Sequence, residues 1–197
     1  MRNLSLAALV GLLVACQPSS PEQRSETPQT PAPPAGPAVG TPEWKIESAT
    51  SAAPAAIGSN ATVLDWPAEE GGEMAQLRAG TNGWTCMPDM PDTPADDPMC
   101  LDGPWMAWAA GWMSHTEPDV KGLGLAYMLQ GGSDASNTDP YATEPDPATG
   151  WIMSGPHVMI VVPNPAMLDG MTTDHTSGGP YVMWKGTPYA HVMMPVK

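Results

Sequence analysis

Basic residues and phenylalanine are scarce in this chain of 197 residues. It carries 7 Lys and Arg against 21 Asp and Glu, and it has no Phe. A formal net charge of −14 repels a phosphate backbone, so we expect no nucleic-acid partner. The acidic residues are spread along the chain rather than gathered in blocks, which indicates an ordinary solvated surface.

The chain also lacks a long apolar run near its start. The apolar segment from Leu4 to Val14 is well short of the roughly 20 residues that span a bilayer. It follows a basic start and ends at the small residue Ala15, a pattern typical of a secretory signal. A membrane helix that is never cleaved and a buried thiol in an ordinary helix are the alternatives for this segment.

Residues 13 to 16, Leu-Val-Ala-Cys, resemble the lipobox of bacterial lipoproteins. The resemblance implies that residues 1–15 are removed and that Cys16 becomes an acylated N-terminus, which holds the protein at a membrane through its lipid. Gln17 follows this Cys, whereas an Asp there resembles an inner-membrane retention signal. The expected place is therefore the cell envelope, at the outer membrane facing the periplasm.

Composition divides the rest of the chain into a tether and a domain. Residues 16–42 are rich in Pro, Ser, Thr and Gln and predict a disordered tether that follows the lipidated Cys. Residues 43–197 are enough for one compact globular domain. The Ala- and Ser-rich stretch 48–58 is interpreted as a loose arm at its start.

Only three cysteines are present, and the lipid occupies Cys16. Cys86 and Cys100 remain as an even pair in an oxidising compartment, so we predict a disulfide between them. Closing a loop of about 15 residues contributes roughly 3 kcal/mol on the chain-entropy model. A metal site with two thiolates or a catalytic thiol is the alternative interpretation.

Alternating apolar residues bounded by turn residues predict six strands, and one segment predicts a helix. Asp102 is its expected cap, with Pro104 in the first turn, and three tryptophans follow on one stripe that we assign to the core. Asn164 is expected to cap a second, short helix at 166–169. The fold class is α+β, a mostly antiparallel sheet with one main helix packed on it. The predicted strands are 61–66, 74–78, 124–130, 157–162, 181–184 and 191–196.

The C-terminal part repeats one pattern: Gly-Pro-His-Val-Met at 155, Gly-Pro-Tyr-Val-Met at 179 and Tyr-Ala-His-Val-Met at 189. Three uneven copies are too few for a solenoid, so we expect neighbouring strands of one sheet. The segments starting at Gly80, Tyr127 and Gly178 resemble a family of uncharacterised secreted bacterial proteins. That resemblance implies one compact secreted domain and no particular activity.

Methionine and tryptophan are abundant, with 15 and 8 copies. They can fill the core space that Phe and Leu usually take. Residues two apart in a strand share a face, so His157 lies with Met159 and His191 lies with Met193. If the two strands are neighbours, two imidazoles and two thioethers can converge, a ligand set that suits Cu(I). The sharper hypothesis is therefore a copper site.

The loop from Gly131 to Pro140 offers oxygen ligands. Asp134, Asn137 and Asp139 could bind Ca²⁺ or a small ligand, although their spacing is not that of an EF-hand. Asx side chains in turns usually hydrogen-bond to their own backbone, which is the alternative.

Catalytic motifs are missing: the chain contains neither Gly-x-Ser-x-Gly nor His-Glu-x-x-His. Gly122-Leu-Gly-Leu-Ala starts like a dinucleotide loop but lacks the third glycine. We therefore predict a lipid-anchored envelope protein with a non-enzymatic binding or interaction role. The alternative is an envelope hydrolase or ligand-modifying enzyme of unknown substrate, in which His115 or His175 would meet a Ser and a carboxylate.

Overall fold

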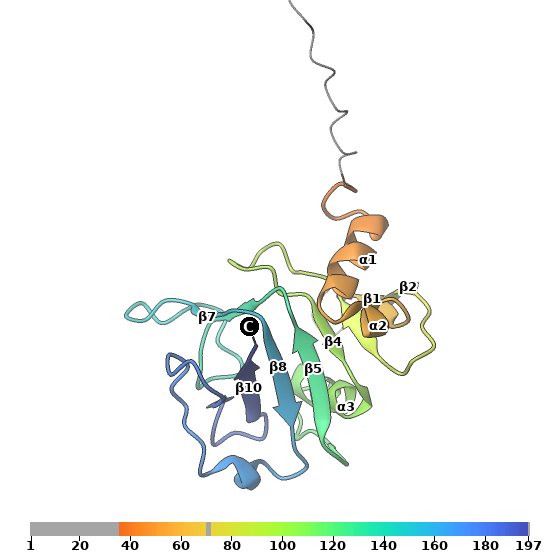
Figure 1. The fold of residues 1–197 in the computed structure, drawn as a ribbon. Coiled ribbons are helices and arrows are strands. Elements are labelled where there is room, and N and C mark those ends of the chain that lie inside the picture. Colours follow the sequence, from red (N-terminus) through yellow and green to blue (C-terminus); the bar gives the residue numbers. More distant parts are fainter. Residues whose placement is uncertain (1–35, 70–71, 197) are drawn as a thin grey trace, which may run out of the picture. The chain divides into compact units, whose positions relative to one another are not determined.

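The sheet is large and mixed. The computed structural model describes residues 36–69 and 72–196, in which eight strands join in the order β2-β1-β3-β4-β5-β8-β10-β9 (Figure 1). All neighbours are antiparallel except β1 and β3. The strands are β1 (Thr62–Asp65), β2 (Ala75–Arg78), β3 (Thr85–Met87), β4 (Met99–Leu101), β5 (Gly124–Met128), β8 (His157–Val161), β9 (Tyr181–Met183) and β10 (His191–Pro195).

The repeated pattern forms neighbouring strands, as predicted. The strands β8, β10 and β9 carry its three copies and lie side by side at one end of the sheet. All six strands predicted from alternation are present within one or two residues of their expected ends. A separate hairpin of β6 (Gly132–Asp134) and β7 (Ile152–Ser154) was not predicted, because three-residue strands carry too little pattern.

Helices are few, and the expectation of a single main helix is only partly met. The predicted helix is α3 (Gly103–Met113), and α1 (Pro42–Ser51) has nearly the same length. Two short elements, α2 (Ala55–Gly58) and η1 (Pro165–Leu168), complete the set. Within the described ranges, none of the helices combines the length and the apolar character that a bilayer crossing requires.

Both predicted helix caps form. The Asp102 side chain accepts a hydrogen bond from the Trp105 amide at 3.0 Å, which typically stabilises a helix end by about 1 kcal/mol. The other Asp102 oxygen accepts from the Leu125 amide at 2.7 Å, so the cap also ties α3 to β5. Asn164 accepts from the Ala166 amide at the start of η1.

The interpretation of residues 48–58 as a loose arm was wrong. They form the end of α1 and all of α2, and the side chains of Ala49 and Ala52 are fully buried. Alanine lets a helix approach the strands β1, β3 and β4 closely, so small side chains here are packing residues. The compact unit begins at Gly36, six residues before α1, so it includes the last part of the segment assigned to the tether.

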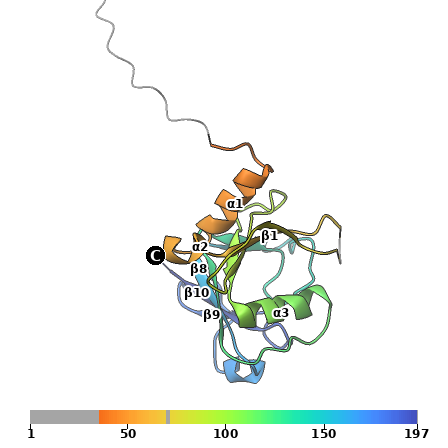
Figure 2. The ribbon, with the colours of Figure 1, turned by 90° about the vertical axis from the view of Figure 1, so that its right-hand side faces the viewer.

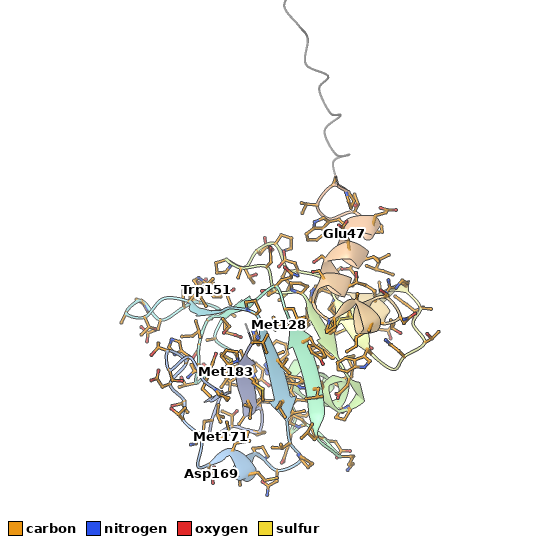
Figure 3. The ribbon with its side chains drawn as sticks, in the orientation of Figure 1. Glu47, Met128, Trp151, Asp169, Met171 and Met183 are labelled. Atoms are coloured by element: carbon orange, nitrogen blue, oxygen red, sulfur yellow. A yellow bond between two sulfur atoms is a disulfide. The ribbon has the colours of Figure 1, made fainter. Side chains whose placement is uncertain are left out.

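The helices cover different faces of the sheet. The side chains of α3 pack against the buried methionines of β5, β8, β9 and β10, which together make the main core. The opposite face has two smaller cores, one under α1 and α2 and one under η1. Figure 2 shows α1 and α2 away from α3, with the strands between them. In Figure 3, Met128 of β5 and Met183 of β9 belong to the main core, whereas Met171 lies beside η1.

The predicted disulfide is present. Cys86 of β3 and Cys100 of β4 are direct partners in the antiparallel register, and a disulfide joins them. The loop between them is held further by Asp97, whose carboxylate accepts from the Met90 amide at 3.1 Å and the Thr93 hydroxyl at 2.6 Å. Cys16, the signal segment 1–15 and most of the tether lie outside the described residues.

Candidate functional site

The predicted His-x-Met strands place four side chains on one face. β8 and β10 pair antiparallel, with Met159 directly opposite Met193 and His157 opposite Pro195. Since residues two apart share a face, both histidines lie with the two methionines on the face that α3 covers. All four side chains are buried.

The register also separates the two imidazoles. His157 and His191 flank the methionine pair on opposite sides, four residues apart along the sheet, which corresponds to about 13 Å between backbones. One metal ion can therefore contact both rings only if both side chains lean over the methionine pair. The convergence of all four ligands stays a prediction with this geometric condition attached.

Aromatic rings enclose His191. The ring centroids of Trp105, Trp108 and Trp184 lie 5.1–5.4 Å from its own, each at a steep angle. Its Nδ1 donates to the Tyr189 carbonyl at 3.0 Å. Burial lowers the pKa of His191 to about 4, against the opposing effect of that carbonyl, so the ring is neutral at physiological pH.

His157 has a free ligand atom. Its Nδ1 lies 2.7 Å from the Gly155 carbonyl, which can only accept, so Nδ1 carries the hydrogen. Nε2 of the neutral ring therefore holds a lone pair, and it is buried without a hydrogen-bond partner in the described structure. Burial lowers the pKa of His157, although the carbonyl opposes this effect. A backbone carbonyl on one ring nitrogen is the usual support of a metal-binding imidazole.

A small cavity opens beside His157. It has a volume of about 70 Å³ and lies where β7, the end of β10 and the segment around residue 175 meet. We call it the edge cavity. Its lining consists of Met153, Ser154, Gly155, His157, His175, Tyr181, Met193 and Pro195.

Sequence reasoning named two members of this lining, His157 and Met193, as candidate metal ligands, whereas it considered His175 only for catalysis and did not consider Met153. Neither of the missed residues belongs to a His-x-Met pair. The one sequence signal for this part of the lining was the apolar Met153 in a short segment between Gly150 and Gly155-Pro156. Only the fold brings residues 153, 175 and 193 to one place.

Two carboxylates lie at the hairpin that carries Met153: Asp134 belongs to β6 and is half-buried, and Asp97 is buried. Burial, assisted by the charge of Asp97, raises the pKa of Asp134 to about 7. Burial also raises the pKa of Asp97 to about 6, although hydrogen bonds from Thr93 and Met90 oppose this. Gly132 separates Asp97 from His157, because a Cβ added there would lie 3.7 Å from both side chains.

The three residues predicted as an oxygen-ligand loop have separate surroundings. The charge of Asp97 acts on Asp134, whereas Asn137 donates to the Thr173 carbonyl at 2.9 Å. Asp139 accepts from the Tyr141 amide two residues on, which is the local turn role weighed as the alternative. Among the described residues, no three His, Cys, Asp or Glu side chains form a group that could hold a metal ion.

The histidines considered for catalysis also lie apart. His115 stacks on Tyr141 with ring centroids 4.1 Å apart, at a position of positive φ just after α3. His175 shares the edge cavity with Ser154, but the lining of that cavity contains no carboxylate. The enzymatic alternative stays a prediction without a catalytic arrangement at either histidine.

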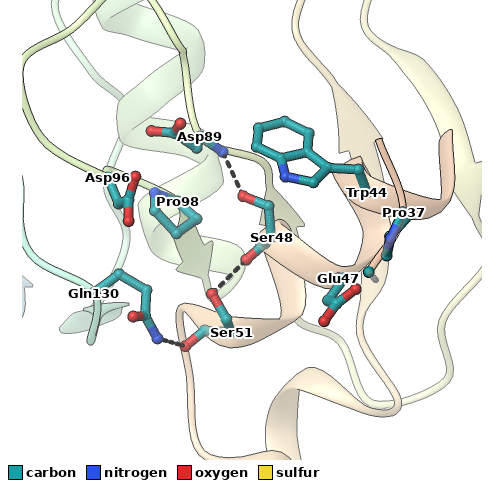
Figure 4. Close-up of a pocket in the computed structure, with 10 residues that line it drawn as sticks. Pro37, Trp44, Glu47, Ser48, Ser51, Asp89, Asp96, Pro98 and Gln130 are labelled. Atoms are coloured by element: carbon teal, nitrogen blue, oxygen red, sulfur yellow. Dashed lines mark hydrogen bonds between the residues drawn. The ribbon is translucent and has the colours of Figure 1, made fainter. Parts of the chain in front are cut away.

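A larger cleft of about 350 Å³ lies between α1 and the disulfide loop (Figure 4). Trp44, Glu47 and Ser48 of α1 form one wall, and Asp89 and Asp96 lie across from them. The walls are joined where the Asp89 amide donates to the Ser48 hydroxyl at 2.9 Å. An indole with three carboxylates and no basic residue would favour a cationic ligand.

No protein-family model matches this chain, and neither the curated proteins nor the solved structures include a match. Function must therefore be argued from the residues themselves.

Proposed function

We propose that this protein is a lipid-anchored cell-envelope protein that binds Cu(I) beside β8 and β10. The observation that carries the proposal is the buried Nε2 of His157, which has no hydrogen-bond partner in the described structure, on a residue that lines a small cavity together with Met193. Neutral imidazole and thioether are soft ligands that Cu(I) prefers over hard cations. The lipobox resemblance supports the envelope location, and the binding role is non-enzymatic.

The protonation state of His157 agrees with this role. A metal can take the Nε2 lone pair without competing for a proton when the pKa of the ring is low. The Gly155 carbonyl holds the tautomer and the orientation of the ring before the metal arrives. Met193 is 2% exposed, so its sulfur is held in place by packing.

The test is a Cu(I) titration of the full mature chain, purified with its anchor in detergent. Ascorbate should serve as the reductant, because thiol reductants would reduce the disulfide. A competing chelator sets the concentration of free Cu(I). We expect about one tight equivalent, weakened at least about tenfold in His157→Ala and in Met193→Leu.

Met194→Leu is the matched control, since Met194 follows Met193 but points to the other face of the sheet. It should leave the affinity unchanged. Absence of a tight equivalent in the wild-type chain, or equal weakening in Met194→Leu, would disprove the proposed function. Thermal melts of each variant show whether it is folded before its affinity is interpreted.

A further inference from the structure

The edge cavity contains more soft donor groups than the two used so far. Its lining includes two imidazoles, from His157 and His175, and two thioethers, from Met153 and Met193. A cavity of about 70 Å³ is only a few times larger than the space that one water molecule occupies. These four residues therefore border one and the same small space.

We infer that Met153 and His175 complete the Cu(I) site with His157 and Met193. This inference rests on the proposed function and specifies its ligands. The set offers imidazole nitrogen and thioether sulfur and contains no carboxylate, which suits a soft ion such as Cu(I). The absence of carboxylates from the lining disfavours Ca²⁺ and Mg²⁺, which need oxygen ligands.

The four ligands divide into a buried pair and an exposed pair. His157 and Met193 are each 2% exposed and form the inner side of the site. Met153 is 55% exposed, which is unusual for so apolar a side chain, and His175 is exposed as well. The buried pair would hold the ion, and the exposed pair would form the route by which it enters.

Hydrogen bonds and ring contacts position the wall between these pairs. The Tyr181 hydroxyl and the Ser154 hydroxyl lie 3.2 Å apart, which joins β9 to the strand that carries Met153. The His175 ring lies 6.3 Å from the Tyr181 ring and meets it edge-on. Asp174, next to His175, accepts from the Thr176 amide and hydroxyl, which fixes the turn.

An exposed pair of ligands also defines the exchange chemistry. Copper in this site can be passed directly to or from a second soft ligand set, because a donor atom can displace Met153 or His175 while the buried pair keeps the ion. No electron is transferred in this step, since Cu(I) enters and leaves in the same oxidation state. The site is therefore built for exchange of Cu(I) rather than for permanent storage.

The experiment repeats the Cu(I) titration with His175→Ala and Met153→Leu in the full mature chain. Both positions are exposed, so the variants should fold as the wild type does. Each should weaken Cu(I) binding at least about tenfold. X-ray absorption of the loaded wild type should show nitrogen and sulfur neighbours, with the sulfur contribution reduced in Met153→Leu.

Two matched controls exist in the same chain. His115→Ala removes another exposed imidazole, and Met167→Leu removes a thioether that is 69% exposed on η1. Both should bind as the wild type does. If His175→Ala and Met153→Leu also bind normally while His157→Ala does not, the inference fails but the proposed function stands. If the wild type binds no copper tightly, both fail.

Discussion

At the scale of the residue, His191 illustrates how burial controls charge. Three indoles surround its ring, and the Tyr189 carbonyl occupies its Nδ1. Desolvation disfavours the imidazolium form, which is why its pKa falls to about 4. An unfolded chain would leave the ring in water with a pKa near 6.5. Between about pH 4 and 6.5, the unfolded chain therefore binds a proton at this ring and the folded chain does not.

This difference predicts a pH dependence that His191→Phe should remove. Between about pH 6.5 and 4 the unfolded state binds a proton that the folded state does not, so His191 lowers the free energy of unfolding as pH falls. In metal-free protein, the stability of His191→Phe relative to wild type should rise by up to about 3 kcal/mol over this window. Urea denaturation at several pH values measures it.

The variant also loses the hydrogen bond to the Tyr189 carbonyl, at a cost of about 1 kcal/mol that does not depend on pH. The informative quantity is therefore the change with pH and not the offset. Asp134 and Asp97 have raised pKa values and the opposite pH dependence, but they are present in both proteins and cancel in the comparison. A constant difference from pH 7 to 4.5 would show that His191 is not buried as described.

At the scale of the element, α3 depends on a close approach that only glycine allows. A Cβ at Gly111 would lie 2.7 Å from the Pro118 backbone, whereas a Cβ at Gly103, at the start of the same helix, meets nothing within 4 Å. The segment around Pro118, which follows α3, therefore packs directly against the backbone of the helix at Gly111. This contact holds the tryptophans of α3 against the main core.

We predict opposite outcomes for two alanine substitutions in α3. Gly111→Ala should lower the free energy of unfolding by about 1–3 kcal/mol, because the added methyl displaces the Pro118 segment. Gly103→Ala should leave stability unchanged or raise it by up to about 1 kcal/mol, since alanine favours a helix. Equal effects of the two substitutions in chemical denaturation would contradict the close approach.

At the scale of the whole molecule, three of the four basic residues that the structure describes are used in structural contacts. Lys45 pairs with Asp65, Arg78 donates to the carbonyls of Gly58 and Ala61, and Lys185 donates to carbonyls near η1. Neither the cleft between α1 and the disulfide loop nor the edge cavity has a Lys or Arg in its lining. With a formal charge of −14, the molecule attracts cations rather than anions.

The location of the molecule depends on one residue outside the described ranges. The lipobox resemblance predicts that Cys16 is acylated, so Cys16→Ala should move the protein from the membrane fraction to the soluble fraction. Fractionation of cells followed by detection of the protein in each fraction measures this. A variant that remains in the membrane with the electrophoretic mobility of the wild type would refute the lipoprotein assignment.

The sequence by itself determined the elements whose signal is local. Alternation located six strands, Asp102 and Asn164 marked two helix starts, and the repeated pattern that ends in Val-Met identified β8, β9 and β10 as neighbours. The even pair of cysteines predicted the disulfide. The start of α1 was also marked, by Thr41 as cap and Pro42 in the first turn, but the Ala-rich stretch after it hid the helix.

Only the tertiary structure decided the elements and sites that depend on distant contacts. The strands β3, β4, β6 and β7 were not predicted. The longer strands β1 and β5 supply hydrogen-bond partners to β3 and β4, whereas β6 and β7 pair only with each other within the described residues. Register decided that His157 and His191 flank the methionine pair on opposite sides along the sheet. Chain folding brought His175 and Met193 to Met153 and His157, since residues far apart in sequence share a cavity only after the strands between them have paired.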